Sequence, residues 1–92
     1  MTALSARDAQ ARLSKLNGWQ IESGQLVKTF QFQSFPGALN FVNRVGELAE
    51  EAGHHPDIDI RYTRVKLSLT THDAGGLTGK DFDLAEQADK AT

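Results

Sequence analysis

Two stretches of alternating hydrophobic and polar residues predict two β-hairpins in this 92-residue chain. Segments 19–21 and 26–32 alternate on either side of turn-forming residues, and segments 57–62 and 65–71 alternate across a very short link at 63–64. Alternation with a period of two is typical of strands that bury one face. The inner face of the second hairpin is expected to hold Ile58, Ile60, Tyr62, Val65, Leu67 and Leu69.

Apolar residues at helical spacing, together with capping residues, predict three helices. Ser5, Ser34 and Thr78 are suited to the N-cap position, where a hydroxyl accepts a hydrogen bond from a free backbone N–H. Asn17-Gly18 is suited to end the first helix, and Gly53 to end the second in the left-handed conformation. The second helix carries an arc of apolar positions that comprises Ala38, Phe41, Val42, Val45, Leu48, Ala49 and Ala52.

The resulting order of elements is α-β-β-α-β-β-α. Each helix has one apolar stripe and each strand has one apolar face, so the simplest packing is a four-stranded antiparallel sheet with three helices on one face. This is an α+β architecture, and residues 1–92 are expected to form a single domain because no linker or repeat interrupts them. So short a chain encloses only a modest core, which favours assembly into a homodimer or a homotetramer.

Composition narrows the classes of function. The chain has no cysteine, so disulfides, thiolate nucleophiles and cysteine-based zinc sites cannot form. Ten basic and twelve acidic residues are interspersed with a net charge of −2, which disfavours nucleic acid as a partner. No segment has the apolar run of a targeting peptide or a membrane span, and we expect a cytoplasmic location.

All three histidines of the chain lie within residues 54–72. His54 and His55 directly follow the predicted second helix, and His72 lies where a strand runs into a glycine-containing loop. Rigid scaffolds usually display functional groups at such element ends. Imidazole is the side chain that titrates nearest neutrality, so this cluster favours proton-transfer chemistry.

Two carboxylates precede the adjacent histidines at helical spacing. Glu50 lies four residues before His54 and Glu51 lies four residues before His55, which would pair them if the helix continued through Gly53. One competing interpretation is that the histidines are merely solvated near the negative end of a helix. Another is a zinc site, but adjacent histidines diverge and the helical His-x₃-His spacing is absent, so we predict no metal.

Three further residues have a structural interpretation beside a functional one. Trp19 and Tyr62 could stack on a planar ligand, although single aromatic residues in strands more often pack in the core. Asp81 is explained as a helix-capping carboxylate, so its removal is expected to cost about 1 kcal/mol of stability and little direct function.

The candidate functional residues and their spacing together resemble the signature of the pterin-4a-carbinolamine dehydratases. The motif comprises Glu50, His54-His55-Pro56, Tyr62, His72 and Asp81 at fixed spacings. The resemblance extends over nearly the whole chain, including the element order, Trp19 at the first strand and the segment Thr71 to Thr78. Fixed positions at this spacing are far more specific than an isolated pair of histidines.

The resemblance implies a lyase that needs no cofactor and whose substrate is the pterin itself. Members of the family dehydrate 4a-hydroxytetrahydropterin to quinonoid dihydropterin, which recycles the pterin used by aromatic amino acid hydroxylases. By the resemblance, the catalytic residues are Glu50, His54, His55 and His72. We expect substrate contacts from Trp19, Gly53, Pro56, Thr70, Thr71 and Asp73.

A protein-binding module is the alternative class of function. Animal members of the family also act as dimerisation partners of a homeodomain transcription factor, and such a role needs no histidines. The intact histidine set therefore favours the enzyme.

Overall fold

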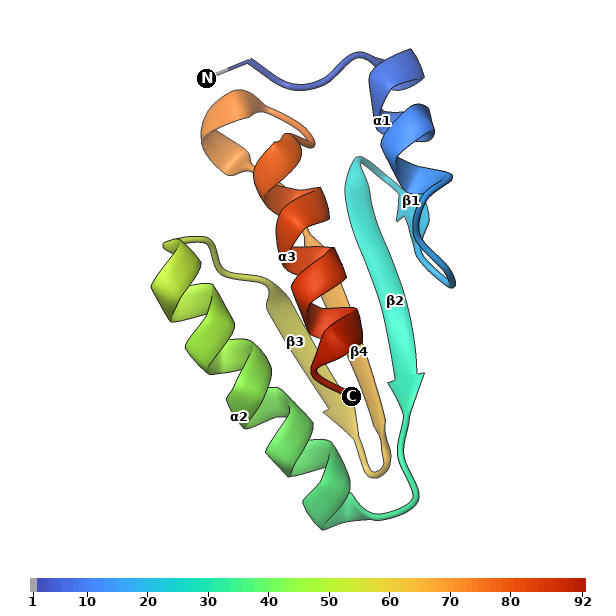
Figure 1. Cartoon of the computed structure of the whole chain (residues 1–92), viewed down its shortest axis with the longest axis vertical. Helices are drawn as coiled ribbons and strands as arrows, with labels where there is room; N and C mark the ends of the chain where they lie inside the picture. Colours follow the sequence, from blue (N-terminus) through green and yellow to red (C-terminus); the bar gives the residue numbers. More distant parts are fainter. Residues whose placement is uncertain (1) are drawn as a thin grey trace.

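Four antiparallel strands form one sheet, and three helices cover one of its faces (Figure 1). The computed structural model describes residues 2–92. The elements are α1 (Ala6–Leu13), β1 (Gln20–Glu22), β2 (Gln25–Gln31), α2 (Phe35–Ala52), β3 (Asp57–Arg61), β4 (Arg64–Leu69), the 3₁₀ turn η1 (His72–Ala74) and α3 (Gly79–Lys90). The predicted fold class and element order are confirmed.

The strand order is β1-β2-β4-β3, so the two hairpins meet through β2 and β4. All three pairings are antiparallel, and the central one aligns Leu26 with Leu69 and Phe30 with Val65. The helices bury their apolar faces on this central pair. The rings of Phe30 in β2 and Phe41 in α2 contact each other in a tilted arrangement, with centroids 4.6 Å apart. The core therefore lies between β2, β4 and the helices.

The three predicted N-caps are confirmed. Ser5 and Ser34 accept hydrogen bonds from the backbone N–H groups three residues later, and Thr78 forms a capping box with Asp81. The end of α1 differs from the prediction, because the helix stops at Leu13 rather than at Asn17-Gly18. Beyond Ser14 the backbone bonds span three residues instead of four, which tightens the chain into turns.

The second hairpin turns one residue earlier than predicted and exposes part of its inner face. Tyr62 lies in the turn with a positive φ of 54° and is 75% exposed, so the expectation that it faces the core is wrong. Ile58 and Ile60 are each 37% exposed, whereas Val65, Leu67 and Leu69 of β4 are buried. The physical reason is that β3 is an edge strand with no neighbouring strand on its outer side, and Ile58 borders an open groove beside α2.

Trp19 is a core residue at the far end of α3 from the histidines. Its side chain is buried against Phe30, and its indole N–H donates to the Asp89 carboxylate at 3.0 Å. The Lys28 ammonium group binds the same carboxylate at 2.8 Å. The expected contact of Trp19 with substrate is therefore corrected to a packing role, because its indole face is occupied by the core.

We predict that Trp19→Phe lowers the free energy of unfolding by about 1–2 kcal/mol, since it removes one hydrogen bond from a buried position and leaves a small cavity. Urea denaturation followed by circular dichroism measures the effect. Glu22→Gln on the exposed strand β1 is the control and should leave stability unchanged. If Trp19→Phe lowered the free energy of unfolding no more than Glu22→Gln does, the structural role of the indole would be contradicted.

Candidate functional site

Three element junctions meet around one open pocket of about 280 Å³. The exit of α2 contributes the adjacent histidines, the end of β4 contributes the segment that enters η1, and the start of α3 contributes a lysine. The lining residues are Gly53, His54, His55, Thr70, Thr71, His72, Asp73 and Lys80. All three histidines of the chain therefore line the same pocket, as the sequence predicted.

Gly53 directs the two adjacent histidines out of the helix. It adopts the left-handed conformation with φ of 63°, and its N–H bonds the carbonyl of Glu50 while the N–H of His54 bonds the carbonyl of Ala49. This pair of bonds is a Schellman ending, which reverses the chain direction after the last helical turn. A residue with a side chain would be strained at this φ, so the glycine fixes the path of His54 and His55.

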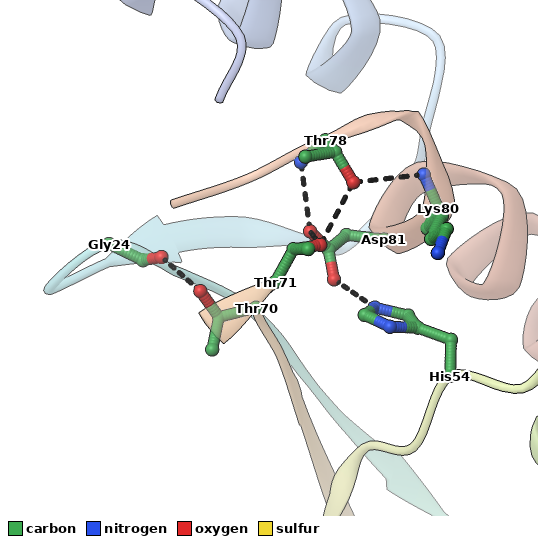
Figure 2. A network of polar contacts seen from close by, with 7 residues as sticks. All are labelled: Gly24, His54, Thr70, Thr71, Thr78, Lys80 and Asp81. Carbon is green, nitrogen blue, oxygen red and sulfur yellow. Dashed lines mark hydrogen bonds and ion pairs between the residues drawn. The ribbon is translucent and has the colours of Figure 1, made fainter. Parts of the chain in front are cut away.

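Asp81 anchors His54 from the interior of the protein, as Figure 2 shows. The Asp81 side chain is fully buried, and its Oδ1 lies 2.5 Å from Nε2 of His54. Its Oδ2 accepts hydrogen bonds from the Thr71 hydroxyl at 2.8 Å and from the Thr78 backbone N–H at 3.0 Å. The predicted cap is thus confirmed, but the same carboxylate also ties together the exits of α2 and β4.

The hydrogen-bond pattern places the proton of the His54–Asp81 pair. Because Oδ2 of Asp81 accepts from both Thr71 and Thr78, we assign Asp81 as an acceptor-only carboxylate to which His54 donates Nε2–H. In the neutral imidazole this tautomer leaves a lone pair on Nδ1. Thr78 in turn donates its hydroxyl to Thr71, so the polar groups of the network have compatible donors and acceptors.

The second histidine pairs with a different carboxylate from the one its spacing suggested. Glu50 lies 2.5 Å from Nε2 of His55, five residues away, and not beside His54. The helical (i, i+4) expectation fails because Gly53 ends the helix and rotates the following residues. Glu50 and His55 are 79% and 61% exposed, so water competes with this pair far more than with the buried one.

Some predicted site residues lie outside the pocket, and two residues that line or support it were not predicted to do so. Glu50 reaches it only through His55, while Pro56 and Trp19 are absent from its lining. Lys80 lines it and Asp81 supports it, although neither was expected to take part. For Asp81 the signal was available in the spaced motif, whereas Lys80 carried none beyond its position at a helix start.

Within residues 2–92, no three histidine, aspartate or glutamate side chains converge as metal ligands do. The same residues include no helix long and apolar enough to cross a membrane. The pocket is lined by three imidazoles, two of which have carboxylate partners, and by a lysine and an exposed aspartate. Such groups can donate, accept and relay protons to a small polar ligand.

Comparison with known proteins agrees with this description. The family model "Pterin 4 alpha carbinolamine dehydratase" matches residues 2–91. A protein of Roseiflexus sp. (strain RS-1), named "Putative pterin-4-alpha-carbinolamine dehydratase", is 60% identical over 89 residues, covering 97% of this chain and 96% of that protein. A Chloroflexus aurantiacus protein of the same name is 53% identical over 90 residues, covering 98% of this chain and 97% of that protein.

Two solved structures have the same fold. The Brucella melitensis protein described as a transcriptional coactivator/pterin dehydratase superposes with a TM-score of 0.94 at 28% identity, over 98% of both chains. A pterin dehydratase-like protein identified as a RuBisCO assembly factor in the alpha-carboxysome superposes with a TM-score of 0.66 at 27% identity. That match covers 79% of this chain and 84% of the other.

The fold and the pocket define a small α+β protein that gathers imidazoles at the ends of its strands and helices. The family model and the similar relatives identify the particular family within this class. The chain belongs to the pterin-4a-carbinolamine dehydratase family.

We predict that Asp81→Ala lowers the free energy of unfolding by about 2–4 kcal/mol, because it leaves the buried Thr71 hydroxyl, the Thr78 backbone N–H and His54 without their shared acceptor. Ser34→Ala, which removes a cap and nothing else, should cost only about 1 kcal/mol. Urea denaturation compares the two variants. If Asp81→Ala lowered the free energy of unfolding no more than Ser34→Ala does, the network would be contradicted. Additive effects of Asp81→Ala and His54→Ala on that free energy, measured in a double-mutant cycle, would contradict it as well.

Proposed function

We propose that this chain dehydrates 4a-hydroxytetrahydropterin to quinonoid dihydropterin and water by histidine acid/base catalysis. The observation that supports the proposal most strongly is the convergence of His54, His55 and His72 on one pocket, with His54 held by a buried carboxylate. The pocket volume of about 280 Å³ is near the lower end of small-molecule sites, which suits a compact bicyclic ligand. In this proposal the pterin is the substrate and no cofactor takes part.

The reaction needs one proton donor and one proton acceptor. The carbon–oxygen bond at C4a breaks, and the hydroxyl leaves as water after it receives a proton. A proton also leaves the neighbouring ring nitrogen, and the electron pair of that N–H bond forms the carbon–nitrogen double bond of the product. One proton donor and one proton acceptor are therefore sufficient for the reaction, and no oxidant or reductant is needed.

We assign the acceptor role to His54. Its Nε2–H is committed to Asp81, so Nδ1 is the nitrogen free to take a proton, and the carboxylate then stabilises the imidazolium that forms. The donor is His55 or His72, both of which line the same pocket. Nε2 of His55 has the Glu50 carboxylate as its hydrogen-bond partner.

Polar groups at the pocket rim fit the amide and amino edge of a pterin. Asp73 is an exposed acceptor for amino and ring N–H groups, and Lys80 is a donor for the ring carbonyl. Gly53 leaves open space where another residue would carry a side chain, so the ligand can approach the backbone there. The Thr71 hydroxyl is already engaged by Asp81, so we assign it to positioning rather than to direct recognition.

Protein binding is a second candidate function, favoured by the names of the two structural relatives. One is described as a coactivator as well as a dehydratase, and the other as a RuBisCO assembly factor. A binding module needs an accessible surface but not three imidazoles at one pocket. Turnover by the purified chain therefore separates the two candidates.

We predict that replacing His54, His55 and His72 together by alanine reduces the catalysed rate to that of the spontaneous reaction. Each single replacement should lower turnover by about 10²- to 10⁴-fold, as is usual for loss of one acid/base group. Stopped-flow absorbance, with freshly generated 4a-hydroxytetrahydropterin, measures quinonoid dihydropterin formation.

Lys66→Gln on the outer face of β4 is the matched control, since it alters an exposed polar side chain away from the pocket. It should retain full turnover. A triple variant that catalyses as fast as the wild type would exclude histidine catalysis. A folded wild-type chain without turnover would favour the binding module.

A further inference from the structure

The sheet face that the helices leave uncovered carries a cluster of positive side chains at one end. Along β4 the buried residues Val65 and Leu67 face the helices, so the intervening Arg64 and Lys66 lie on the opposite face. Arg61 of β3 is paired directly with Arg64, so its side chain shares that face. Three cations therefore meet on the exposed sheet surface beside the turn between β3 and β4.

The two arginines form a like-charge pair that the hairpin holds in place. Residues directly opposite each other in an antiparallel pair have Cβ atoms about 4.5–5.5 Å apart, and like charges at such positions are destabilising. β3 ends at Arg61 and β4 begins at Arg64, so these residues are the last pair before the turn. The short turn fixes their register. An anion bound between the two guanidinium groups would replace their repulsion by attraction.

One carboxylate, that of Asp59, neutralises only part of this cluster. Nε of Arg61 lies 3.4 Å from Oδ2 of Asp59, which is a long hydrogen bond, and Lys66 is directly opposite Asp59 in the register. Nε of Arg64 donates to Oε1 of Gln31 at 3.1 Å, which is a neutral partner. Three cations and one carboxylate leave two positive charges in excess, although the formal net charge of the whole chain is −2.

A small open pocket of about 160 Å³ lies among these side chains, and we call it the arginine pocket. Its lining residues are Thr29, Asp59, Arg61, Arg64 and Lys66. The pocket is smaller than the histidine pocket of about 280 Å³, so it suits a single small ionic group better than a bicyclic ring. Guanidinium groups bind phosphate oxygens through two parallel hydrogen bonds, and the ammonium and hydroxyl groups add further donors.

We propose that the arginine pocket binds the dianionic phosphate group of a small phosphomonoester, with Arg61 and Arg64 donating hydrogen bonds to its oxygens. A dianion matches the excess of two positive charges, and the remainder of the ligand extends into solvent from the open sheet face. The interspersed charges and net negative charge of the chain disfavour nucleic acid as the source of the phosphate.

The arginine pocket is separate from the histidine pocket. Arg64 begins β4 and His72 follows the other end of that strand, and the two pockets share no lining residue. Phosphate binding therefore does not rest on the proposed dehydratase function. Absence of dehydratase turnover would leave the binding proposal intact, and absence of phosphate binding would leave the dehydratase proposal intact.

An NMR titration with methyl phosphate tests the site directly. The backbone amide and arginine side-chain resonances are followed at about pH 7.5 and a constant chloride concentration of about 0.1 M, which screens weak attraction at a distance. The largest shifts should occur at the Nε–H groups of Arg61 and Arg64, and they should saturate to give one dissociation constant. Shifts that increase linearly without saturation would overturn the proposal, because they indicate attraction without a site.

Four exposed substitutions, none of which is expected to prevent folding, test the assigned roles. Arg61→Gln and Arg64→Gln should each raise the dissociation constant about tenfold, because each removes a charged donor. Asp59→Asn should lower it several-fold, because a negative charge is removed from the lining. Arg7→Gln on α1 removes an equal charge far from the pocket and should change the constant less than about twofold. An unchanged constant in both arginine variants, or weaker binding by Asp59→Asn, would overturn the proposal.

The pH dependence of binding separates the arginine pocket from the histidine pocket. A phosphomonoester gains its second negative charge with a pKa of about 6, and the charged groups that line the arginine pocket are two arginines, a lysine and an aspartate. Binding there should strengthen as the pH rises from about 5.5 to about 7.5. Histidines lose their positive charge over the same range, so binding by them would weaken. Weakening binding with the largest shifts at His72 and Lys80 would overturn the proposal.

Three related probes test which chemical group is recognised. Dimethyl phosphate carries a single negative charge and should bind about tenfold more weakly than methyl phosphate. Inorganic phosphate presents the same dianion and should bind about as tightly as methyl phosphate. Equal binding of the monoester and the diester would overturn the match to a dianion. Binding of inorganic phosphate without binding of methyl phosphate would overturn the phosphomonoester as the occupant.

Discussion

The burial of one carboxylate, Asp81, is the constraint on which the arrangement of the histidine site depends. Moving a carboxylate out of water costs several kcal/mol unless its oxygens find donors. Those donors come from three separate segments, namely His54 after α2, Thr71 after β4 and Thr78 before α3. The elements must therefore dock together before the charge is satisfied, and docking sets the position of the imidazole. Folding stability and preorganisation of the pocket are two results of the same contacts.

The helix caps and strands could be predicted from the sequence because they depend on residues close together in the chain. Ser34 bonds a backbone group three residues away, and alternation along β4 reports which of its side chains are buried. The partner of His54 is 27 residues away, and no spacing rule connects the two. Only a motif that already includes Asp81 relates them. The partner of His55 is local, but the left-handed Gly53 changed it from the helical expectation.

Alternation also did not reveal which strand would be an edge. It placed Ile58 and Ile60 on the inner face of their hairpin, but their exposure depends on the order β1-β2-β4-β3 and on how far the helices extend over the sheet. Both are properties of the whole fold. The same limit applies to Trp19, whose indole found its acceptor on the last turn of α3, far along the chain. Local patterns predict the elements, and the tertiary arrangement decides the environment of each side chain.

The two carboxylate–imidazole pairs show how environment separates groups with the same chemistry. Both have nitrogen–oxygen distances of 2.5 Å, yet the Asp81 side chain is fully buried and that of Glu50 is 79% exposed. A buried pair interacts in a low dielectric and keeps one orientation, whereas an exposed pair is screened and exchanges with water. One imidazole is therefore fixed by the fold of a single chain, and the other is adjustable. Acid/base catalysis at one pocket requires two such groups in different states.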